Sequence, residues 1–139
     1  AGFDHYETSN YAQPGHVSTH NQGYWRGEDY LGLGPSAVST LKSTRWKNVP
    51  DTASYVAQVQ SLGHALVESE ILNPEASRLE RIALGLRTQD GISLEFLSME
   101  SRQRALSFVD EGLAKISANQ LILIHHGRAL VDPIAAELI

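Results

Sequence analysis

"NPEASRLERIALGLRT" (residues 73–88) is the stretch that decides the fold, because it combines a helix start signal with a helical period. Asn73 can cap a helix, and Pro74 and Glu75 suit its first turn. Apolar residues then recur at i, i+3, i+4 and i+7, which makes one apolar stripe. The stripe consists of Leu79, Ile82, Ala83 and Leu86. "RLER" (78–81) is most simply the solvated face. The stretch therefore predicts an amphipathic helix packed on a core.

A second helix is expected on the N-terminal side of this stretch. Asp51 or Thr52 can cap it, and Gly63 is a plausible end, since glycine commonly follows the last helical turn. Its apolar residues are Tyr55, Val56, Val59 and Leu62.

Further elements are expected on the C-terminal side. A third helix should cover about 99–116, with an inward face of Leu106, Val109, Leu113 and Ile116. "QLILIHHGRALVD" (120–132) predicts a small hairpin around His126 and Gly127, followed by a final helical turn from Asp132. The order of these elements suggests a mostly helical, winged-helix-like domain over 51–139, used for packing rather than for reading DNA.

Residues 1–46 differ in character, because they hold both tryptophans, most tyrosines and more than half of the glycines. "GFDHYETSNY" (2–11) predicts a strand with one buried face, "AQPGH" (12–16) a turn, and "YLGLGPSAVS" (30–39) a strand entering a tight loop. Two or three such strands are marginal alone. Either they fold back on the helical half, or they are the last strands of a larger sheet that this chain lacks.

Composition excludes several classes of protein. The longest aliphatic run, "LILI" (121–124), is far too short to span a membrane. No leader opens the chain and it contains no cysteine, so it can form no disulfide or thiolate metal site, and a cytoplasmic location fits. The net charge of −5, without a basic stripe, argues against nucleic-acid binding.

"HNQGYW" (20–25) is the segment richest in chemistry. His20 can ligate haem iron, and Asn21 can orient that imidazole through a hydrogen bond. Tyr24 and Trp25 can offer flat faces to a porphyrin. Spacing alone favours a structural interpretation, in which His20 bonds the backbone of a tight loop and the two aromatic rings fill a core.

Three ordered motifs, "HYETSNYAQPG" (5–15), "HNQGYW" and "DYLGLGPSAVS" (29–39), resemble the C-terminal part of radical-SAM proteins related to oxygen-independent coproporphyrinogen III oxidase. Within these proteins the full HNxxYW pattern is similar to the haem-chaperone branch, the HemW type. "LGLRTQDGIS" (84–93) and "GRALVDPIAAEL" (127–138) match the same family more loosely, so the resemblance covers essentially the whole chain.

The resemblance implies an α+β fold, with 1–46 as the last strands and loops of an incomplete β/α barrel and 51–139 as the winged-helix-like C-terminal domain. It implies that the full-length protein binds S-adenosylmethionine and a [4Fe–4S] cluster, whose cysteine loop lies outside this cysteine-free chain. The residues expected to line the S-adenosylmethionine pocket are Gly34, Ser36 and Val38. Those expected to bind haem are His20, Asn21, Tyr24 and Trp25, with His20 on the iron.

Three departures from the family pattern bear on function. Thr8 replaces an aliphatic residue, Gln13 replaces an arginine, and Val38 stands where the chaperone branch has a histidine. An aliphatic residue at position 38 resembles the dehydrogenase branch instead, whereas Tyr24 and Trp25 favour the chaperones.

Three functions therefore remain open for the whole protein. The first is a haem chaperone that hands haem to an acceptor protein. The second is a coproporphyrinogen III dehydrogenase that decarboxylates two propionates, and the third is a non-catalytic interaction module. On each of them the fragment alone lacks radical chemistry, and the open edge of its sheet is expected to favour self-association.

Two further polar positions have simpler interpretations. Glu7 is a candidate for a barrel cavity, because strand alternation places it on the same face as His5, although a salt bridge or strand-end hydrogen bond also explains it. His125 and His126 are expected to be solvated turn residues, since adjacent strand residues point to opposite faces and cannot easily chelate one metal.

Overall fold

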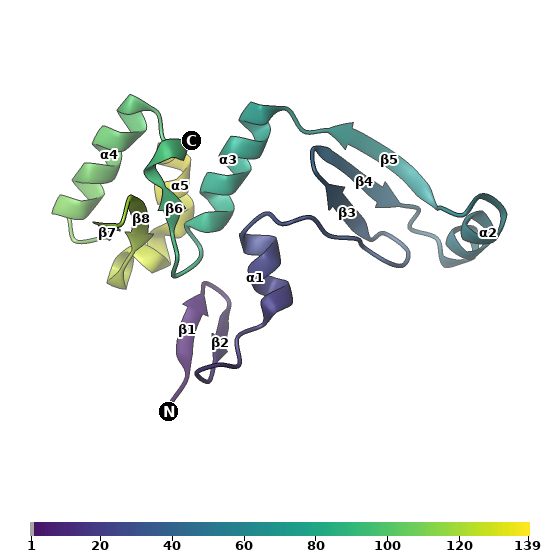
Figure 1. Cartoon of the computed structure of the whole chain (residues 1–139), viewed down its shortest axis with the longest axis horizontal. Coiled ribbons are helices and arrows are strands. Elements are labelled where there is room, and N and C mark those ends of the chain that lie inside the picture. The colour runs from purple at the N-terminus through teal and green to yellow at the C-terminus, as the bar shows by residue number, and fades with distance from the viewer. Residues whose placement is uncertain (1) are drawn as a thin grey trace. The chain divides into compact units, whose positions relative to one another are not determined.

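Five α-helices and eight short strands make up residues 2–139, which the computed structural model describes (Figure 1). The strands form one two-stranded and two three-stranded sheets, so the expected α+β class is confirmed. The chain divides into two compact units. One comprises the chain up to Gly27 together with Arg78–Ile139, and the other comprises Glu28–Ser77.

The unit Glu28–Ser77 is built on an antiparallel sheet of β3 (Val38–Leu41), β4 (Thr44–Asn48) and β5 (Leu66–Ile71), in the order β3-β4-β5. β5 was not expected from the sequence. It pairs with β4 across the division proposed at residues 46–51, because the helix between them is short and returns the chain beside β4. That division, made for the longer protein, stays a prediction.

The helix α2 (Thr52–Leu62) confirms the expected start and end signals. An Asp51 carboxylate oxygen accepts the Ser54 N–H at 2.8 Å, and this bond lowers the pKa of Asp51. Gly63 ends the helix at φ +77°, where its N–H donates to the Val59 carbonyl at 3.0 Å. None of the helix residues is buried, so capping rather than packing defines its ends.

The C-terminal elements follow the order α3 (Pro74–Gly85), β6 (Ile92–Ser93), α4 (Met99–Asp110), β7 (Ala114–Ser117), β8 (Gln120–Leu123) and α5 (Val131–Leu138). Short 3-10 helices span Leu94–Phe96 and His125–Leu130. The three strands form an antiparallel sheet in the order β6-β8-β7.

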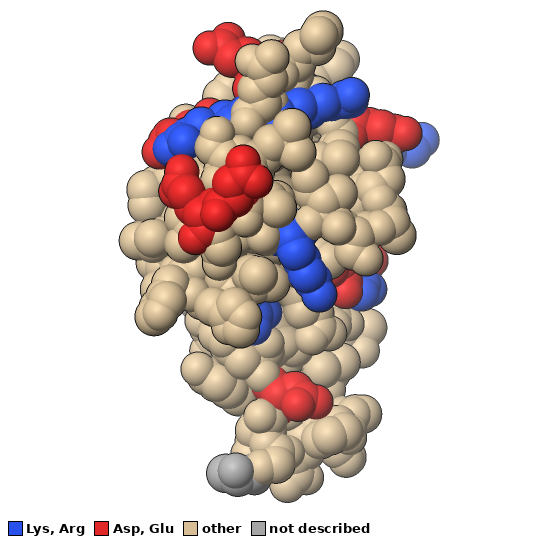
Figure 2. All heavy atoms as spheres, turned by 90° about the vertical axis from the view of Figure 1, so that its left-hand side faces the viewer, with Lys and Arg blue, Asp and Glu red and all other residues tan. Residues whose placement is uncertain are grey.

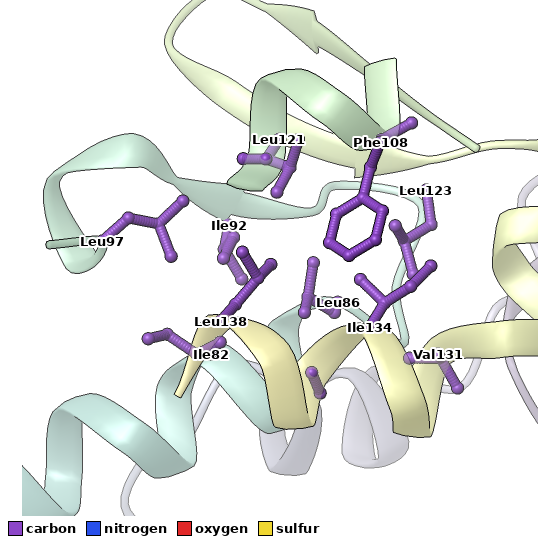
Figure 3. Packing of buried hydrophobic residues seen from close by; sticks show 13 residues of the cluster. Ile82, Leu86, Ile92, Leu97, Phe108, Leu121, Leu123, Val131, Ile134 and Leu138 are labelled. Atoms are coloured by element: carbon purple, nitrogen blue, oxygen red, sulfur yellow. The ribbon is translucent and has the colours of Figure 1, made fainter. Parts of the chain in front are cut away.

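The amphipathic helix predicted from residues 73–88 is confirmed as α3. Asn73 accepts the Ala76 N–H at 2.7 Å through its side-chain oxygen, as a cap should. Ile82 and Leu86 are almost fully buried, and Figure 3 shows them facing residues of α4, β8 and α5. The remaining large members of this core are Ile92, Leu97, Phe108, Leu121, Leu123, Val131, Ile134 and Leu138.

The prediction for the third helix was wrong in its length and partly wrong in its inward face. α4 ends at Asp110, and Gly112 then takes φ +72°, which starts the connection to β7. Ala105 and Phe108 are buried, whereas Leu106 is 54% exposed and Ile116 lies on β7. The prediction extended the helical spacing past the end of α4 into β7, where the chain reverses direction. The buried face of the helix was therefore placed incorrectly.

The hairpin was also predicted at the wrong place. β7 and β8 are joined at Ala118 and Asn119, which both have positive φ (48° and 65°), the conformation of a tight two-residue hairpin turn. His126 and Gly127 instead lie in the 3-10 helix that follows β8, where both His125 and His126 are exposed. The final helix, predicted from Asp132, is confirmed as α5.

The N-terminal residues form a hairpin of β1 (Asp4–Glu7) and β2 (Asn10–Ala12), not the single strand that was expected. The turn predicted at 12–16 is confirmed, with Gly15 at φ +80° and the His16 N–H donating to the Gln13 carbonyl at 2.9 Å. The hairpin is joined to the helical half by backbone hydrogen bonds. The Thr8 N–H donates to the Arg87 carbonyl at 2.9 Å, so the hairpin packs on that half, whereas β3 and β4 belong to the other unit.

The face shown in Figure 2 carries interspersed basic and acidic side chains rather than a continuous basic surface. Among residues 2–139, no helix is both long enough and apolar enough to cross a membrane.

Alanine substitutions of Leu106 and Phe108 on α4 should show which of these two residues faces the core. Phe108→Ala removes a buried ring and should lower the free energy of unfolding by about 3–5 kcal/mol. Leu106→Ala, on the exposed side of the same helix, should change it by less than about 1 kcal/mol. Urea unfolding of both variants measures the difference, and equal losses would contradict the helix orientation.

The contact between α4 and α5 should depend on pH. Arg104 lies 4.3 Å above the Phe108 ring and hydrogen-bonds Glu137, which raises the pKa of Arg104 and lowers that of Glu137. A lowered carboxyl pKa stabilises the fold above the pKa of the unfolded chain, and this stability is lost as pH falls through the folded value. Glu137→Gln should therefore lower the melting temperature at pH 7 and have no effect in acid.

The matched control is Glu95→Gln, which removes an exposed carboxylate that has no ion pair within the described part of the chain. It should leave the melting temperature unchanged at both pH values. If Glu137→Gln still lowers the melting temperature at a pH below the lowered pKa of Glu137, the substitution acts by some route other than the ion pair.

Candidate functional site

The segment "HNQGYW" lies on the helix α1 (Thr19–Trp25), not in a tight loop as expected. Ser18 caps this helix, because its hydroxyl oxygen accepts the Asn21 N–H at 3.2 Å. Past the helix, Gly27 takes φ +61° and donates its N–H to the Tyr24 carbonyl at 3.0 Å. The helix was missed because it is short and carries no periodic apolar stripe. None of its residues is fully buried.

The helical geometry divides the motif into two rows. His20 and Tyr24 are four residues apart and therefore share one face. Their rings meet edge to face, with centroids 4.6 Å apart at 82°. Both side chains are exposed, Tyr24 by 38%. The site therefore offers solvent an imidazole whose ring is oriented by a neighbouring phenol.

The second row consists of Asn21 and Trp25. Because adjacent helical residues do not face each other, Asn21 is poorly placed to orient His20. No hydrogen bond joins these two side chains within residues 2–139. Trp25 is half-buried and lines a hollow of about 220 Å³. The structure thus brings His20 together with Tyr24, and Trp25 together with a different set of residues.

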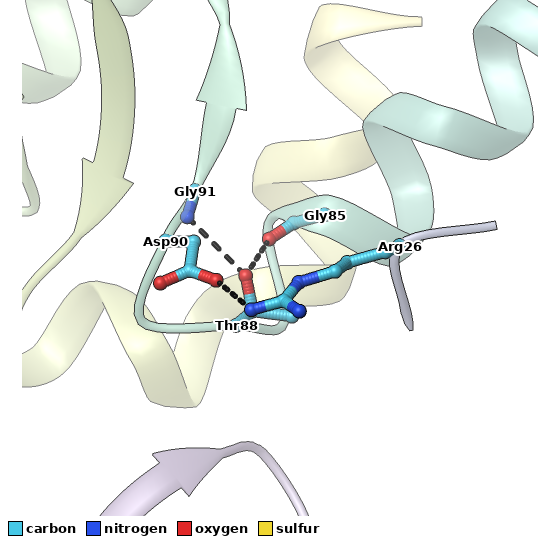
Figure 4. A network of polar contacts seen from close by, with 5 residues as sticks. All are labelled: Arg26, Gly85, Thr88, Asp90 and Gly91. Atoms are coloured by element: carbon cyan, nitrogen blue, oxygen red, sulfur yellow. Dashed lines mark hydrogen bonds and ion pairs between the residues drawn. The ribbon is translucent and has the colours of Figure 1, made fainter. Parts of the chain in front are cut away.

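The hollow beside Trp25 lies where the end of α1 meets the loop between α3 and β6. Figure 4 shows the polar network at its wall. The Thr88 hydroxyl donates to the Gly85 carbonyl at 2.8 Å and accepts the Gly91 N–H at 3.2 Å, which holds the loop in place. Arg26 pairs with Asp90 at 3.0 Å across the rim, and both side chains are about half exposed.

Arg81 is the residue of this hollow that the sequence interpretation missed. The segment 78–81 was expected to be a solvated helix face, but Arg81 lines the hollow and is only partly exposed. Arg78 donates to the Phe96 carbonyl at 2.5 Å, so it too is engaged. Nothing in the sequence distinguishes these arginines from solvated ones, because Arg81 lies against Gly27 beyond the distant α1 and the partner of Arg78 is Phe96, before α4.

Gly34 and Ser36 lie in the loop before β3, whose backbone groups bond within this chain. The Gly34 N–H donates to the Tyr55 hydroxyl at 3.1 Å, and the Ser36 N–H to the Val49 carbonyl at 3.1 Å. Asn48 donates its side-chain amide to the Gly34 carbonyl at 3.0 Å. These two amides are therefore not available to hold the carboxylate of S-adenosylmethionine. A contact of the loop with that cofactor stays a prediction.

Val38 begins β3 and is 36% exposed. It lines a shallow hollow of about 350 Å³ on the sheet. Its cross-strand partner is Lys47 on β4, which lies opposite Glu68 on β5. An exposed aliphatic side chain in such a position can pack against a flat ring. The predicted contact with an adenosyl group is compatible with this placement.

Glu7 is completely buried, and strict alternation with His5 does not hold because the β1–β2 register shifts between the two residues. Its carboxylate accepts the Ser9 N–H at 2.9 Å and a hydrogen bond from the Asn10 side-chain amide. Its backbone forms a bridge to Thr88. These contacts support the strand-end hydrogen bond that was the alternative interpretation.

Residues 2–139 contain no cluster of three or more histidine, cysteine, aspartate or glutamate side chains that could hold a metal ion. The whole chain lacks cysteine, so it supplies no thiolate for an iron–sulfur cluster. A single exposed imidazole suits one axial bond to a haem iron, whose other ligands come from the porphyrin.

Comparison with known proteins shows the class of protein to which the chain belongs. No family model matches the chain. The solved structure of the radical-SAM enzyme coproporphyrinogen III oxidase (HemN) from Escherichia coli matches 99% of the chain with a TM-score of 0.70, at 17% identity and over 37% of that enzyme. This likeness shows a shared fold.

Sequence relatives are more specific. The proteins named "Heme chaperone HemW" are 33% identical over the whole chain in Mycobacterium tuberculosis, and 30% identical over 93% of it in Bacillus subtilis. "Radical S-adenosyl methionine domain-containing protein 1, mitochondrial" of Danio rerio is 32% identical over 78% of the chain. The chain is therefore part of a radical-SAM protein, and within that class it belongs to the HemW type. It spans 36% of the length of the two HemW relatives and 26% of the length of the Danio rerio protein.

Loss of the Glu7 carboxylate should destabilise the hairpin, which tests whether this residue is structural. Glu7→Ala leaves the Ser9 N–H and the Asn10 amide without their buried acceptor, which should cost about 2 kcal/mol or more. Asp4→Ala, an exposed acidic residue on the same strand, should cost less than about 0.5 kcal/mol. Chemical denaturation measures both, and a neutral Glu7→Ala would contradict the structural role.

Proposed function

We propose that the full-length protein is a haem chaperone, which binds haem at α1 and passes it to an acceptor protein. The observation that carries this proposal is the exposed pair of His20 and Tyr24, held four residues apart on one face of a capped helix. The names of the relatives at 30–33% identity support the same function.

The proposed role of His20 is to ligate the haem iron through its imidazole. Tyr24 orients that ring by its edge-to-face contact and offers an aromatic surface to the porphyrin. Trp25 borders the site, and Asn21 contributes through its backbone N–H to the helix start. An exposed site suits cargo that has to leave, because haem bound at a surface can be reached by an acceptor without unfolding the helix.

Membership of the radical-SAM class supports S-adenosylmethionine and a [4Fe–4S] cluster as cofactors of the full-length protein. The cluster would be held by residues outside this chain, because the chain has no cysteine. Val38 is the residue proposed to touch the adenosyl group. In the same proposal residues 1–46 complete a barrel, and the α3–β6–α4–β7–β8 order forms a winged-helix-like packing module.

Coproporphyrinogen III dehydrogenase is the second candidate function, and the aliphatic residue at position 38 favours it. An anaerobic assay of the full-length protein with reductant, S-adenosylmethionine and coproporphyrinogen III separates the two. The chaperone proposal expects no protoporphyrinogen IX, and its formation with turnover would favour the dehydrogenase.

Location and assembly are also proposals. A cytoplasmic location rests on the cysteine-free composition. Self-association of the isolated fragment rests on the sheet β3-β4-β5, in which all six residues of the edge strand β5 are exposed.

A haemin titration of the full-length protein tests the proposed function. His20→Ala should weaken haemin binding at least about tenfold and change the Soret band, because the axial imidazole is lost. His16→Ala, an exposed histidine four residues before His20, is the matched control and should leave both unchanged. An unchanged affinity and Soret band in His20→Ala would remove His20 from the site.

A further inference from the structure

We infer that the hollow beside Trp25 is a subsite for a carboxylate on the edge of the bound tetrapyrrole, with Arg81 as its anchor. This inference rests on the proposed function, since it assigns a propionate of haem to residues outside the His20–Tyr24 face. Three observations support the inference: the unpaired positive charge of Arg81, the residues that surround it, and the size of the hollow.

Arg81 is the arginine of this region whose guanidinium lacks a partner among residues 2–139. Its neighbours in sequence and space are all engaged. Arg78 donates to the Phe96 carbonyl, Arg87 to the Ala83 carbonyl and to Asp132, and Arg26 to Asp90. The only buried side-chain nitrogen or oxygen without a hydrogen bond among residues 2–139 belongs to Arg128, so the nitrogens of the partly exposed Arg81 remain accessible to an incoming anion. A guanidinium matches a carboxylate through two parallel hydrogen bonds.

A glycine keeps the space around Arg81 open. A Cβ at Gly27 would lie 2.7 Å from a terminal nitrogen of Arg81, so any larger residue would push the guanidinium aside. The opposite wall is fixed as well. A Cβ at Gly91 would lie 2.1 Å from the Leu121 carbonyl oxygen, which shows how closely this loop approaches β8. The Arg81 guanidinium therefore lies against Gly27 just past α1, and the Gly91 loop on the other side of the hollow packs directly on β8.

The charges of the lining favour one carboxylate. Arg26 and Arg81 contribute two positive charges, and Asp90 contributes one negative charge that is neutralised by its ion pair with Arg26. The remaining positive charge is that of Arg81. Trp25 and Phe96 also line the hollow, so an anionic group attached to a flat ring finds both a cation and aromatic surfaces.

The size of the hollow selects a substituent rather than a whole tetrapyrrole. Its volume of about 220 Å³ is below the roughly 300–1,000 Å³ of sites that enclose a drug-sized ligand. The ring itself would have to lie outside the hollow, along α1. His20 and Trp25 are five residues apart, about 7.5 Å along the helix axis and about 140° around it. The proposed ligand therefore has to cross α1 from the His20 side to the Trp25 side.

The test compares haemin with its dimethyl ester, in which both propionates are uncharged, on the full-length protein. Wild type should prefer haemin, and Arg81→Gln should reduce this preference roughly tenfold by weakening haemin binding alone. His20→Ala should weaken both ligands equally. Arg102→Gln, an exposed arginine on α4, is the matched control and should leave the preference unchanged.

Each outcome separates the subsite from the chaperone function. If His20→Ala weakens haemin binding but Arg81→Gln leaves the preference for haemin intact, the subsite is wrong and the proposed function stands. If wild type binds neither ligand, both fall. Arg81→Lys keeps the positive charge but cannot make the two parallel hydrogen bonds of a guanidinium. Its preference for haemin over the dimethyl ester should therefore be intermediate. It also provides a second variant if Arg81→Gln proves unstable.

Discussion

Burial of the apolar stripe of α3 is the constraint on which the rest of the first unit depends. Ile82 and Leu86 are 0% and 2% exposed and face α4, β8 and α5. Each such side chain contributes about 1.5–3 kcal/mol when it leaves water. Because a helix has a fixed period, burying this stripe also fixes where its other side chains point. Arg81, one residue before Ile82, is thereby directed to the hollow beside α1.

The helix α1 shows how much the site relies on that scaffold. It is seven residues long and has no buried residue, and an isolated helix of this length is not stable in water. Its order comes from the Ser18 cap and from contacts near its end, where Arg26 pairs with Asp90. The loop carrying Asp90 is in turn held by Thr88 and by the backbone bridge from Glu7. The N-terminal hairpin and α1 are thus both fastened to the segment that follows α3.

Local signals predicted the elements whose causes are local. Asn73, Asp51 and Gly63 marked helix ends correctly, because a cap needs only its neighbours. The turn at Ala118 and Asn119 escaped notice because neither residue is glycine, and both take positive φ only in the context of the paired strands. The free guanidinium of Arg81 could not be predicted either, since the walls of the hollow come from α1 and from the loop before β6. The residue types of "HNQGYW" suggested haem binding, which stays a proposal. Their division into two rows could not be predicted, because the helix was missed.

The proposed haem site and the proposed subsite together require one haem to contact both sides of α1, with iron at His20 and a propionate at Arg81. The most direct measurement is a crystal structure of the full-length protein with haemin bound. We expect an iron bond to the His20 imidazole, the ring against Tyr24, and a carboxylate paired with the Arg81 guanidinium. Haem bound elsewhere, with His20 and Arg81 both without ligand, would contradict it.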